Sequence, residues 1–261
     1  MPIGNLNVKL LEVTDNALAL IYVACRQCYS ANFAGQIFED EIGNIKKQEE
    51  FVRQVVSSGH ESPLEHVKFT FAIEGVSRAL THQLVRHRIA SYSQQSQRYV
   101  KESDFDYIIP PLIEEDADMK KEYIDTMRKI QQSYNCLMSS FEKKGKKGEV
   151  ANQDCRYVLP QAAETKIVVT MNCRQLLHFF KERCCSRAQW EIRRLSGEML
   201  KICKQELSAV FNDAGAKCVL LGYCPEGEKF SCKRYPLKKD ALRQSAPDTV
   251  ISTEGRNLKC Q

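Results

Sequence analysis

Polar and apolar residues alternate along part of the chain, and this alternation predicts β-strands. In residues 66–75 (HVKFTFAIEG), apolar side chains fall on every second position, at Val67, Phe69, Phe71 and Ile73. The positions between them are mainly polar, so one face of this strand should be buried and the other exposed. Residues 7–13 (NVKLLEV) and 166–173 (KIVVTMNC) predict two further strands, and 105–111 (FDYIIPP) predicts extended chain ended by proline.

Five other stretches are predicted to be helical: residues 14–30, 44–60, 76–88, 114–142 and 174–211. Thr14 or Asp15 would cap the first of them. Gly59 would end the second, because glycine is a natural residue at a helix C-terminus. The last helix is expected to break near Cys184.

The stretch 114–142 is predicted to be one long amphipathic helix. Apolar side chains recur there at spacings of three and four, at Met119, Tyr123, Met127, Ile130, Tyr134, Leu137 and Phe141. A charged connector broken by glycines, EKKGKKGEV, follows it. The predicted elements together indicate an α/β (α+β) fold with a central sheet flanked by helices. A scaffold protein could use the long helix as a surface for a partner.

Length and composition are those of a globular protein with a real core. The chain has 261 residues, of which 43% are hydrophobic and 27% charged. Beyond Tyr223 the pattern weakens, so we expect a domain over 1–223 and a polar, cysteine-containing extension over 224–261. No apolar stretch approaches the roughly 20 residues that span a bilayer, and no export signal is present. We therefore expect a cytoplasmic protein without a membrane partner.

The net charge of +5 suits anionic ligands, but it falls short of the excess typical of a dedicated nucleic-acid binder. The twelve cysteines are scattered, so reduced and mostly buried thiols are expected. Cys218, Cys224 and Cys232 match no common zinc-ligand spacing. We expect no metal site.

Residues 86–99, RHRIASYSQQSQRY, contain Arg86, Arg88 and Arg98 but no carboxylate. The planar guanidinium group matches phosphate oxygens and stays charged at any working pH. No glycine-rich phosphate loop of either common type is present, so side chains and exposed backbone would have to hold a nucleotide. The run alone is also compatible with a solvated surface loop or an RNA-binding patch.

The run HESPLEH, residues 60–66, begins and ends with a histidine. The spacing of these histidines and Pro63 exclude the helical zinc motif in which two histidines share one face. Local sequence leaves two interpretations open. The run forms a loop from which His60 and Ser62 face a ligand, or it forms a turn with a capping serine.

Near the predicted third strand, Arg174 and His178 are four residues apart and would share one helix face. Arg183 is nine residues past Arg174, which at about 100° per residue places it on the opposite face. Either the helix breaks between the two arginines or its two faces serve different sites. The second option suggests sites formed between subunits.

The run RHRIASYSQQS, residues 86–96, has the form R-H-R, seven residues, then S. It resembles the signature of the flavin-dependent thymidylate synthase family. Other blocks resemble the same family in the same order: HESPLEHVKFTF (60–71), RYVLP (156–160), MNCRQLLHFF (171–180) and RCCSRAQWEI (183–192). The resemblance covers roughly residues 8–215.

This resemblance implies that the chain converts dUMP to dTMP. Methylenetetrahydrofolate would donate the carbon, and FAD re-reduced by NADPH would carry the hydride. It also implies a homotetramer with active sites shared between subunits, and no nucleic-acid partner. Because all of these ligands are anionic, the site arginines are expected to lack acidic partners.

The resemblance also assigns residues. FAD is expected to contact His60, Ser62, Arg86, His87, Arg88, Asn172, Arg174 and His178. dUMP is expected to contact Gln83, Arg86, Gln94, Ser96, Arg98, Arg156 and Arg183. Arg183 is the expected catalytic residue, and Ser96 is expected to donate a hydrogen bond rather than to act as a nucleophile. Many members of the family carry glutamate where this chain has Gln94, which cannot ionise.

Overall fold

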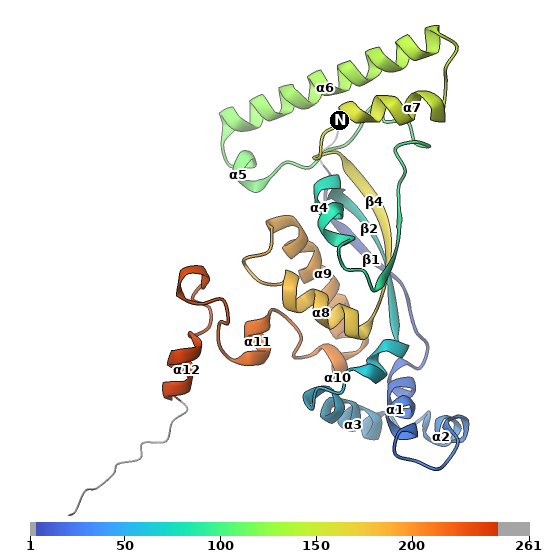
Figure 1. The fold of residues 1–261 in the computed structure, drawn as a ribbon, viewed down its shortest axis with the longest axis vertical. Coiled ribbons are helices and arrows are strands. Elements are labelled where there is room, and N and C mark those ends of the chain that lie inside the picture. The colour runs from blue at the N-terminus through green and yellow to red at the C-terminus, as the bar shows by residue number, and fades with distance from the viewer. Residues whose placement is uncertain (1–3, 245–261) are drawn as a thin grey trace, which may run out of the picture. The chain divides into compact units, whose positions relative to one another are not determined.

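A computed structural model describes residues 4–244 of the chain. The chain divides into two compact units, residues 1–216 and 217–261. The first unit contains a sheet in the order β1-β2-β4-β3, in which every neighbouring pair is antiparallel. The strands are β1 (Asn7–Val13), β2 (Lys68–Ser77), β3 (Ala90–Gln94) and β4 (Glu164–Asn172). This mixture of helices with an antiparallel sheet confirms the expected fold class (Figure 1).

Ten α-helices belong to the described part of the first unit. They are α1 (Ala17–Gln27), α2 (Ala34–Glu41), α3 (Ile45–Ser57), α4 (Arg78–Leu84), α5 (Pro111–Glu114), α6 (Ala117–Lys143), α7 (Glu149–Cys155), α8 (Cys173–Arg183), α9 (Trp190–Glu206) and α10 (Ser208–Phe211). Two 3-10 helices join them, η1 (Ser62–His66) and η2 (Arg156–Val158). The sequence patterns missed α2 and α7. They also missed β3, because its inward side lacks a row of large apolar residues and the strand lies inside the arginine run.

One face of the sheet forms the main core, and its other face is exposed. Phe69, Phe71 and Val169 are completely buried and belong to one apolar cluster with residues of α8 and α9, which lie against this face in Figure 1. The Phe69 and Phe211 rings meet edge to face at 5.7 Å. The alternation predicted for β2 is confirmed, since Lys68 and Glu74, which lie between the buried positions, are exposed.

Helix ends agree with the sequence patterns only in part. Gly59 has a φ of +81°, directly after α3, which confirms the predicted end of that helix. The predicted cap of α1 was wrong, because the N-cap residue is Asn16, without a side-chain hydrogen bond. Helix α4 ends at Leu84, which frees the following residues to form a turn. The break expected near Cys184 is confirmed by the gap between α8 and α9.

Helix α6 has 27 residues and buries a different set of side chains from the predicted stripe. Met127 and Tyr134 are buried as expected, whereas Met119 and Leu137 are 50% and 39% exposed. Gln131 is buried instead, because its amide oxygen accepts from the Phe105 backbone N–H at 2.8 Å. A polar residue is buried at position 131 because it satisfies a backbone N–H of the neighbouring extended segment.

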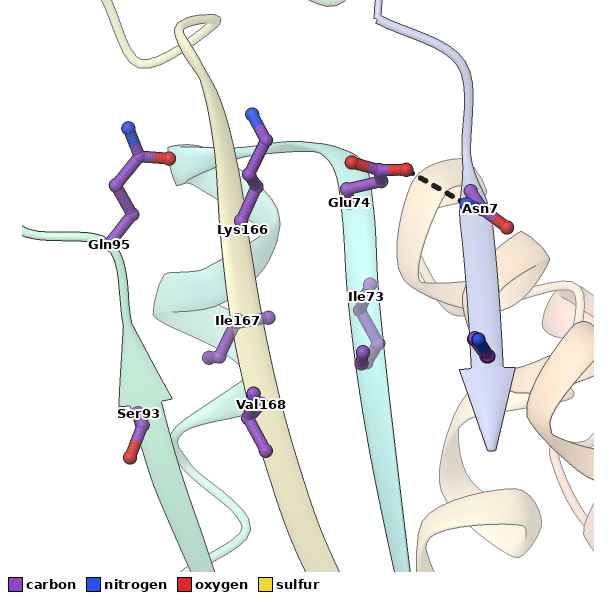
Figure 2. A pocket seen from close by; sticks show the side chains of 10 residues that line it. Asn7, Ile73, Glu74, Ser93, Gln95, Lys166, Ile167 and Val168 are labelled. Atoms are coloured by element: carbon purple, nitrogen blue, oxygen red, sulfur yellow. Dashed lines mark hydrogen bonds between the residues drawn. The ribbon is translucent and has the colours of Figure 1, made fainter. Parts of the chain in front are cut away.

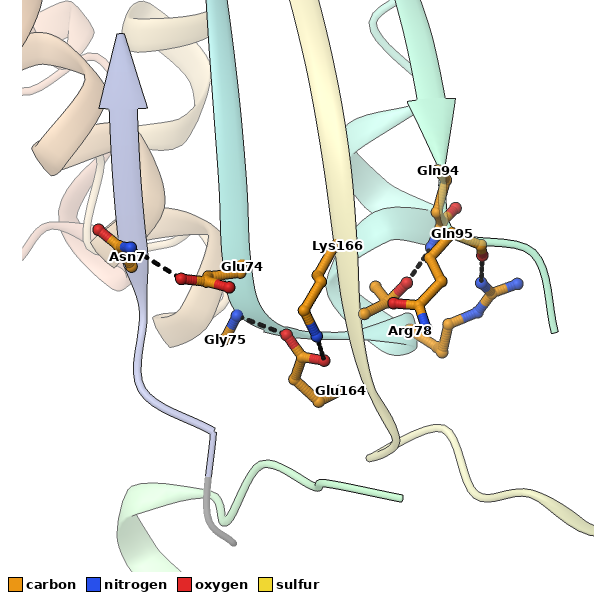
Figure 3. A network of polar contacts seen from close by, with 9 residues as sticks. Asn7, Glu74, Gly75, Arg78, Gln94, Gln95, Glu164 and Lys166 are labelled. Carbon is orange, nitrogen blue, oxygen red and sulfur yellow. Dashed lines mark hydrogen bonds and ion pairs between the residues drawn. The ribbon is translucent and has the colours of Figure 1, made fainter. Parts of the chain in front are cut away.

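A β-bulge interrupts β2 shortly before the strand ends and α4 begins. The register of β2 against β4 shifts between Ile73 and Val76, where Gly75 has a φ of +69°. A Cβ atom at Gly75 would lie 1.8 Å from the backbone oxygen of Asn5, so only glycine fits. The Gly75 N–H donates to the Glu164 carboxylate at 2.7 Å (Figure 3).

The second unit is described over residues 217–244. It contains α11 (Lys217–Leu221), η3 (Glu228–Phe230), α12 (Lys238–Gln244) and a parallel bridge between Cys224 and Leu237. The polar extension expected over 224–261 has short regular elements within the described range, while residues 245–261 lie outside that range. Of the eleven described cysteines only five are buried, fewer than expected.

Candidate active site

The arginine run begins at the tight turn that joins α4 to β3. Arg86 and Arg88 are exposed, whereas His87 between them is only 7% exposed. The Tyr92 hydroxyl lies 2.7 Å from the carbonyl oxygen of His87 and 2.9 Å from that of Leu84, so it can donate to either. Burial raises the pKa of Tyr92 to about 12, so the phenol keeps this proton. The turn is therefore fixed from inside, with two cations pointing outward and one imidazole inward.

The buried His87 ring is held by side chains of α8. Arg183 Nε donates to His87 Nε2 at 3.1 Å, and the side-chain amide of Gln175 lies 3.4 Å from His87 Nδ1. The Phe179 ring meets the imidazole edge to face at 4.9 Å. Burial, and then the charges of Arg183 and His178, lower the pKa of His87 to about 4. The ring is neutral at physiological pH and accepts a hydrogen bond from Arg183.

The arginines of the expected site differ in their partners. Within residues 4–244, the side chains of Arg86, Arg88, Arg156 and Arg183 form no ion pair with a carboxylate. Arg98 pairs with Glu149, so its expected lack of an acidic partner was wrong. Four arginines thus keep a free positive charge for an anionic ligand.

Arg174 is the second arginine with acidic partners, and this too corrects the expectation. It pairs with Glu65 and lies 3.6 Å from the carboxylate of Glu61. Lys181 also pairs with Glu61, at 3.1 Å. These contacts join α8 to η1, which is a 3-10 helix and not the expected loop. The helix is continuous from Arg174 to Arg183, so their opposite faces are not explained by a break.

The eight residues expected to contact FAD lie on three neighbouring segments: η1 with the turn before it, the turn after α4, and α8 with its cap. His60, Ser62 and His178 are exposed. Asn172 caps α8 by accepting from the Gln175 N–H at 2.8 Å, so this amide oxygen has a structural role. No side-chain cap forms at the start of η1, where a capping serine was the alternative interpretation.

A second group of expected site residues gathers at the opposite end of β3. Gln94 Nε2 donates to the hydroxyl oxygens of Thr81 at 3.0 Å and Thr165 at 3.3 Å. Ser96 Oγ accepts from the backbone N–H of Arg98 at 3.2 Å. No histidine or carboxylate bonds to this hydroxyl in the described chain.

Arg78 belongs to this second group, although the sequence patterns did not single it out. Its guanidinium donates to the backbone oxygen of Gln95 at 3.2 Å (Figure 3). Burial, and then the charge of Arg156, lower its pKa. The two guanidinium groups repel each other, which favours an anion at this end of β3, although the charge of Glu102 opposes the effect on Arg78.

Gln175 is another residue that the sequence patterns missed. Gln175, Phe179 and Arg183 are spaced by four residues along α8, and therefore share one face of the helix. This spacing was visible in the sequence. Nothing in the sequence showed that His87, 88 positions earlier, lies against that face.

A shallow trough of about 560 Å³ lies on the exposed face of the sheet (Figure 2). Asn7, Glu74, Ser93, Gln95 and Lys166 are among its lining residues. None of the residues expected to bind FAD or dUMP lines it. Between residues 4 and 244 we also find no cluster of three metal-ligating side chains and no helix long and apolar enough to cross a membrane.

Comparison with known proteins points to the same segments. The family model described as thymidylate synthase complementing protein matches residues 9–207. This chain belongs to the flavin-dependent thymidylate synthase family. A flavin-dependent thymidylate synthase of Nitratidesulfovibrio vulgaris is 54% identical over 250 residues, which cover 95% of this chain and 100% of that protein. The same-named protein of Clostridium tetani is 48% identical over 240 residues, or 89% and 95% of the two chains.

Membership of the flavin-dependent thymidylate synthase family makes the chain an enzyme of the methyltransferase class. The matched span includes η1, α4, β3 and α8, and so contains both groups of expected site residues. It ends before the second unit. The residues matched by the family model therefore include both groups of expected site residues, one at each end of β3.

Proposed function

We propose that the chain converts dUMP to dTMP, with methylenetetrahydrofolate as the carbon donor and FAD, reduced by NADPH, as the hydride carrier. The observation that carries this proposal is the environment of Arg183. Its Nε is bonded to a neutral histidine, and no carboxylate in the described chain neutralises its charge. Such a guanidinium is available to a ligand that becomes negatively charged.

Arg183 would act on the pyrimidine of dUMP. Its guanidinium would stabilise the negative charge that arises when the ring loses its N3 proton, which makes C5 more electron-rich. A fixed donor of this kind commonly contributes about 3–4 kcal/mol, or 10²–10³ in rate. Ser96 would donate a hydrogen bond to dUMP, because no histidine or carboxylate among the described residues is bonded to its hydroxyl.

The chemistry of the donor set fits FAD, which supplies the hydride when it is bound. Arg86 and Arg88 are exposed and lack acidic partners in the described part of the chain, so they suit the pyrophosphate. His60, Ser62 and His178 offer further exposed polar groups on adjoining segments. Asn172, His87 and Arg174 complete the proposed set, and Arg174 would bind the cofactor while it still faces Glu61 and Glu65.

dUMP would contact both ends of β3. Gln83, Arg86 and Arg183 belong to the end near the α4 turn, whereas Gln94, Ser96, Arg98 and Arg156 belong to the other end. The cationic pair Arg78 and Arg156 makes the second end suitable for the phosphate. The strand between the two ends spans about 17 Å at ~3.4 Å per residue.

This separation supports active sites that are shared between subunits of a homotetramer. In such an assembly, the α4 turn of one subunit would meet the far end of β3 from another subunit. The opposite faces taken by Arg174 and Arg183 on one continuous helix agree with this arrangement.

The proposal is tested with purified protein loaded with FAD. We expect a flavin absorption spectrum, and dTMP formation that requires dUMP, methylenetetrahydrofolate and NADPH. Arg183→Ala should retain the flavin spectrum and lose dTMP formation by about 10²–10³-fold. Arg187→Ala is the matched control, since Arg187 is exposed and follows α8. Full turnover in Arg183→Ala, or a covalent dUMP adduct on Ser96, would overturn the assignment.

A further inference from the structure

We propose that His87 is a positioning residue for Arg183: its imidazole accepts the Nε–H of the guanidinium and thereby aims both terminal amino groups at the substrate. The proposal rests on the catalytic role proposed above for Arg183. It gives the buried middle residue of the arginine turn a role of its own, which is separate from any contact with the flavin.

The geometry of the pair is specific. Arginine presents five N–H donors in a planar fork, of which Nε–H is the one nearest the side-chain stem. The bond from Nε to His87 Nε2, at 3.1 Å, fixes the plane of this fork. The four remaining N–H groups have no hydrogen-bond partner among the described residues. The acceptor therefore orients Arg183 without using the donors that a pyrimidine would need.

The His87 ring itself is held from three sides. Its backbone carbonyl lies 2.7 Å from the Tyr92 hydroxyl, the Phe179 ring packs perpendicular to the imidazole at 4.9 Å, and the Gln175 amide lies 3.4 Å from Nδ1. All of these residues except Tyr92 belong to α8, the helix that also carries Arg183. The side chains that hold the His87 ring and the guanidinium of Arg183 therefore come from the same helix.

The bond to Arg183 determines where the imidazole carries its proton. A ring nitrogen that accepts a hydrogen bond has no proton, so neutral His87 must carry its proton on Nδ1. Nδ1–H then needs an acceptor, and the nearest side chain is the amide of Gln175. The structure places the Gln175 amide nitrogen at this 3.4 Å distance from Nδ1. The oxygen and nitrogen of an amide are assigned from the hydrogen-bond network, and the bond to Arg183 requires the two to be exchanged so that the Gln175 oxygen faces Nδ1. In this orientation Gln175 stabilises the tautomer that accepts from Arg183.

Only the neutral ring can perform this role, since imidazolium has no lone pair to offer. The charged groups that face His87 are Arg183, His178 and Glu182, all on α8, and the first two oppose its protonation. Together with burial they hold the pKa of His87 near 4, so the acceptor is available at physiological pH. Acidification through this value would break the bond and place two cations side by side.

The first test replaces the acceptor. His87→Leu removes it, whereas His87→Gln offers an amide oxygen at a similar reach and serves as the conservative rescue. We expect kcat to fall by about 10–100-fold in His87→Leu, because small displacements of a catalytic group have effects of this size. His87→Gln should recover most of kcat. The dUMP dissociation constant, measured by calorimetry on protein loaded with FAD, should change much less than kcat.

The second test uses Gln175 and does not require any change at His87. Gln175→Glu places a carboxylate beside Nδ1–H and raises the pKa of His87, so the acidic limb of the kcat profile should move up by about 1 pH unit or more. Gln175→Leu leaves Nδ1–H without an acceptor and favours the wrong tautomer, so kcat should fall without this shift. An unchanged acidic limb in Gln175→Glu overturns the proposal, and this test remains decisive if His87→Leu does not fold.

A double-mutant cycle separates this proposal from the proposed function. If His87 acts through Arg183, adding His87→Leu to Arg183→Ala should produce no further loss in kcat. Full turnover in Arg183→Ala alone would contradict the proposed function. Loss of turnover in Arg183→Ala, with wild-type kcat in His87→Leu, would contradict only the positioning role.

Discussion

The Ser77 hydroxyl donates to the carboxylate of Glu191 at 2.6 Å, and the Ser77 backbone N–H donates to the same group at 2.7 Å. Ser77 is also the N-cap of α4, where its Oγ accepts from the Leu80 N–H at 3.0 Å. A buried carboxylate at the start of α9 thus fixes the start of the helix that leads to the arginine turn. The position of His87 depends on this anchor.

Removal of the anchor should destabilise the fold. Glu191→Ala leaves a buried N–H without an acceptor, which costs about 1–3 kcal/mol in the free energy of unfolding. The measurement is denaturant unfolding at neutral pH. Glu198→Ala is the matched control, since this half-buried residue of α9 forms a surface ion pair with Lys201 and its loss should cost less than about 0.5 kcal/mol. Equal stability of the two variants would contradict this role of Glu191.

Glu191 should also give the stability a pH dependence. Burial raises its pKa, although the hydrogen bonds from Ser77 oppose this. The folded state therefore binds the proton more tightly than the unfolded chain does. The resulting stability is fully present below the ordinary glutamate pKa of about 4.3 and is lost as pH rises through the folded pKa. The stability difference between wild type and Glu191→Gln should shrink over that range, and a constant difference would contradict it.

A shared active site predicts complementation between two inactive variants. Arg183→Ala inactivates the group of site residues near the α4 turn. Arg156→Ala inactivates the group at the other end of β3. Co-expression of the two chains should restore about a quarter of the sites, because a random mixture pairs two intact halves at that frequency. Arg183→Ala with Arg86→Ala is the control, since both changes affect the same end and should not complement. Activity no higher in the first pair than in the control pair would indicate a site within one chain.

Gln94→Glu, which introduces the residue common in the family, should be less stable than wild type. The Thr81 hydroxyl already donates to the Arg78 carbonyl oxygen at 2.9 Å and accepts from Gln94. A carboxylate cannot donate, so Thr81 would have to give up one of these bonds, at about 1 kcal/mol. Thermal unfolding measures this cost, with Ser93→Ala on the exposed face of β3 as the control. A large gain in kcat would instead show that the reaction benefits from a carboxylate at this position.

Removal of residues 224–261 should leave a catalytic enzyme. All proposed site residues lie within 60–183, and the family match ends at 207. We expect the truncated chain to bind FAD and to form dTMP at a measurable rate. Loss of all turnover, with flavin and tetramer retained, would place part of the site in the second unit.

Local patterns in the sequence predicted those elements whose stability depends on a single buried face. Alternation identified β2 because Phe69 and Phe71 lie on the core side. The same criterion failed for β3, because its inward positions Ala90, Tyr92 and Gln94 are only half-buried and include a polar residue. Its pairing with β4 is visible only in three dimensions.

The candidate site was predicted at the level of residue types but not of contacts. The arginines and their ligand class came from the R-H-R motif and the family resemblance. The ion pairs of Arg98 with Glu149 and of Arg174 with Glu65 join positions 51 and 109 residues apart, beyond the reach of any local pattern. The burial of His87, on which the orientation of Arg183 depends, follows from the packing of α8 against the α4 turn.

The bulge at Gly75 limits how this sequence can vary. A Cβ atom there would overlap the Asn5 backbone, so a genetic screen in a thymidine-requiring host should find no functional replacement for this glycine. Arg183 would be equally intolerant in the same screen, for a different reason. Variants at Gly75 should fail to accumulate as folded protein, whereas variants at Arg183 should accumulate normally. Substitutions would therefore be rejected at Gly75 because of backbone geometry and at Arg183 because of the chemistry of the reaction.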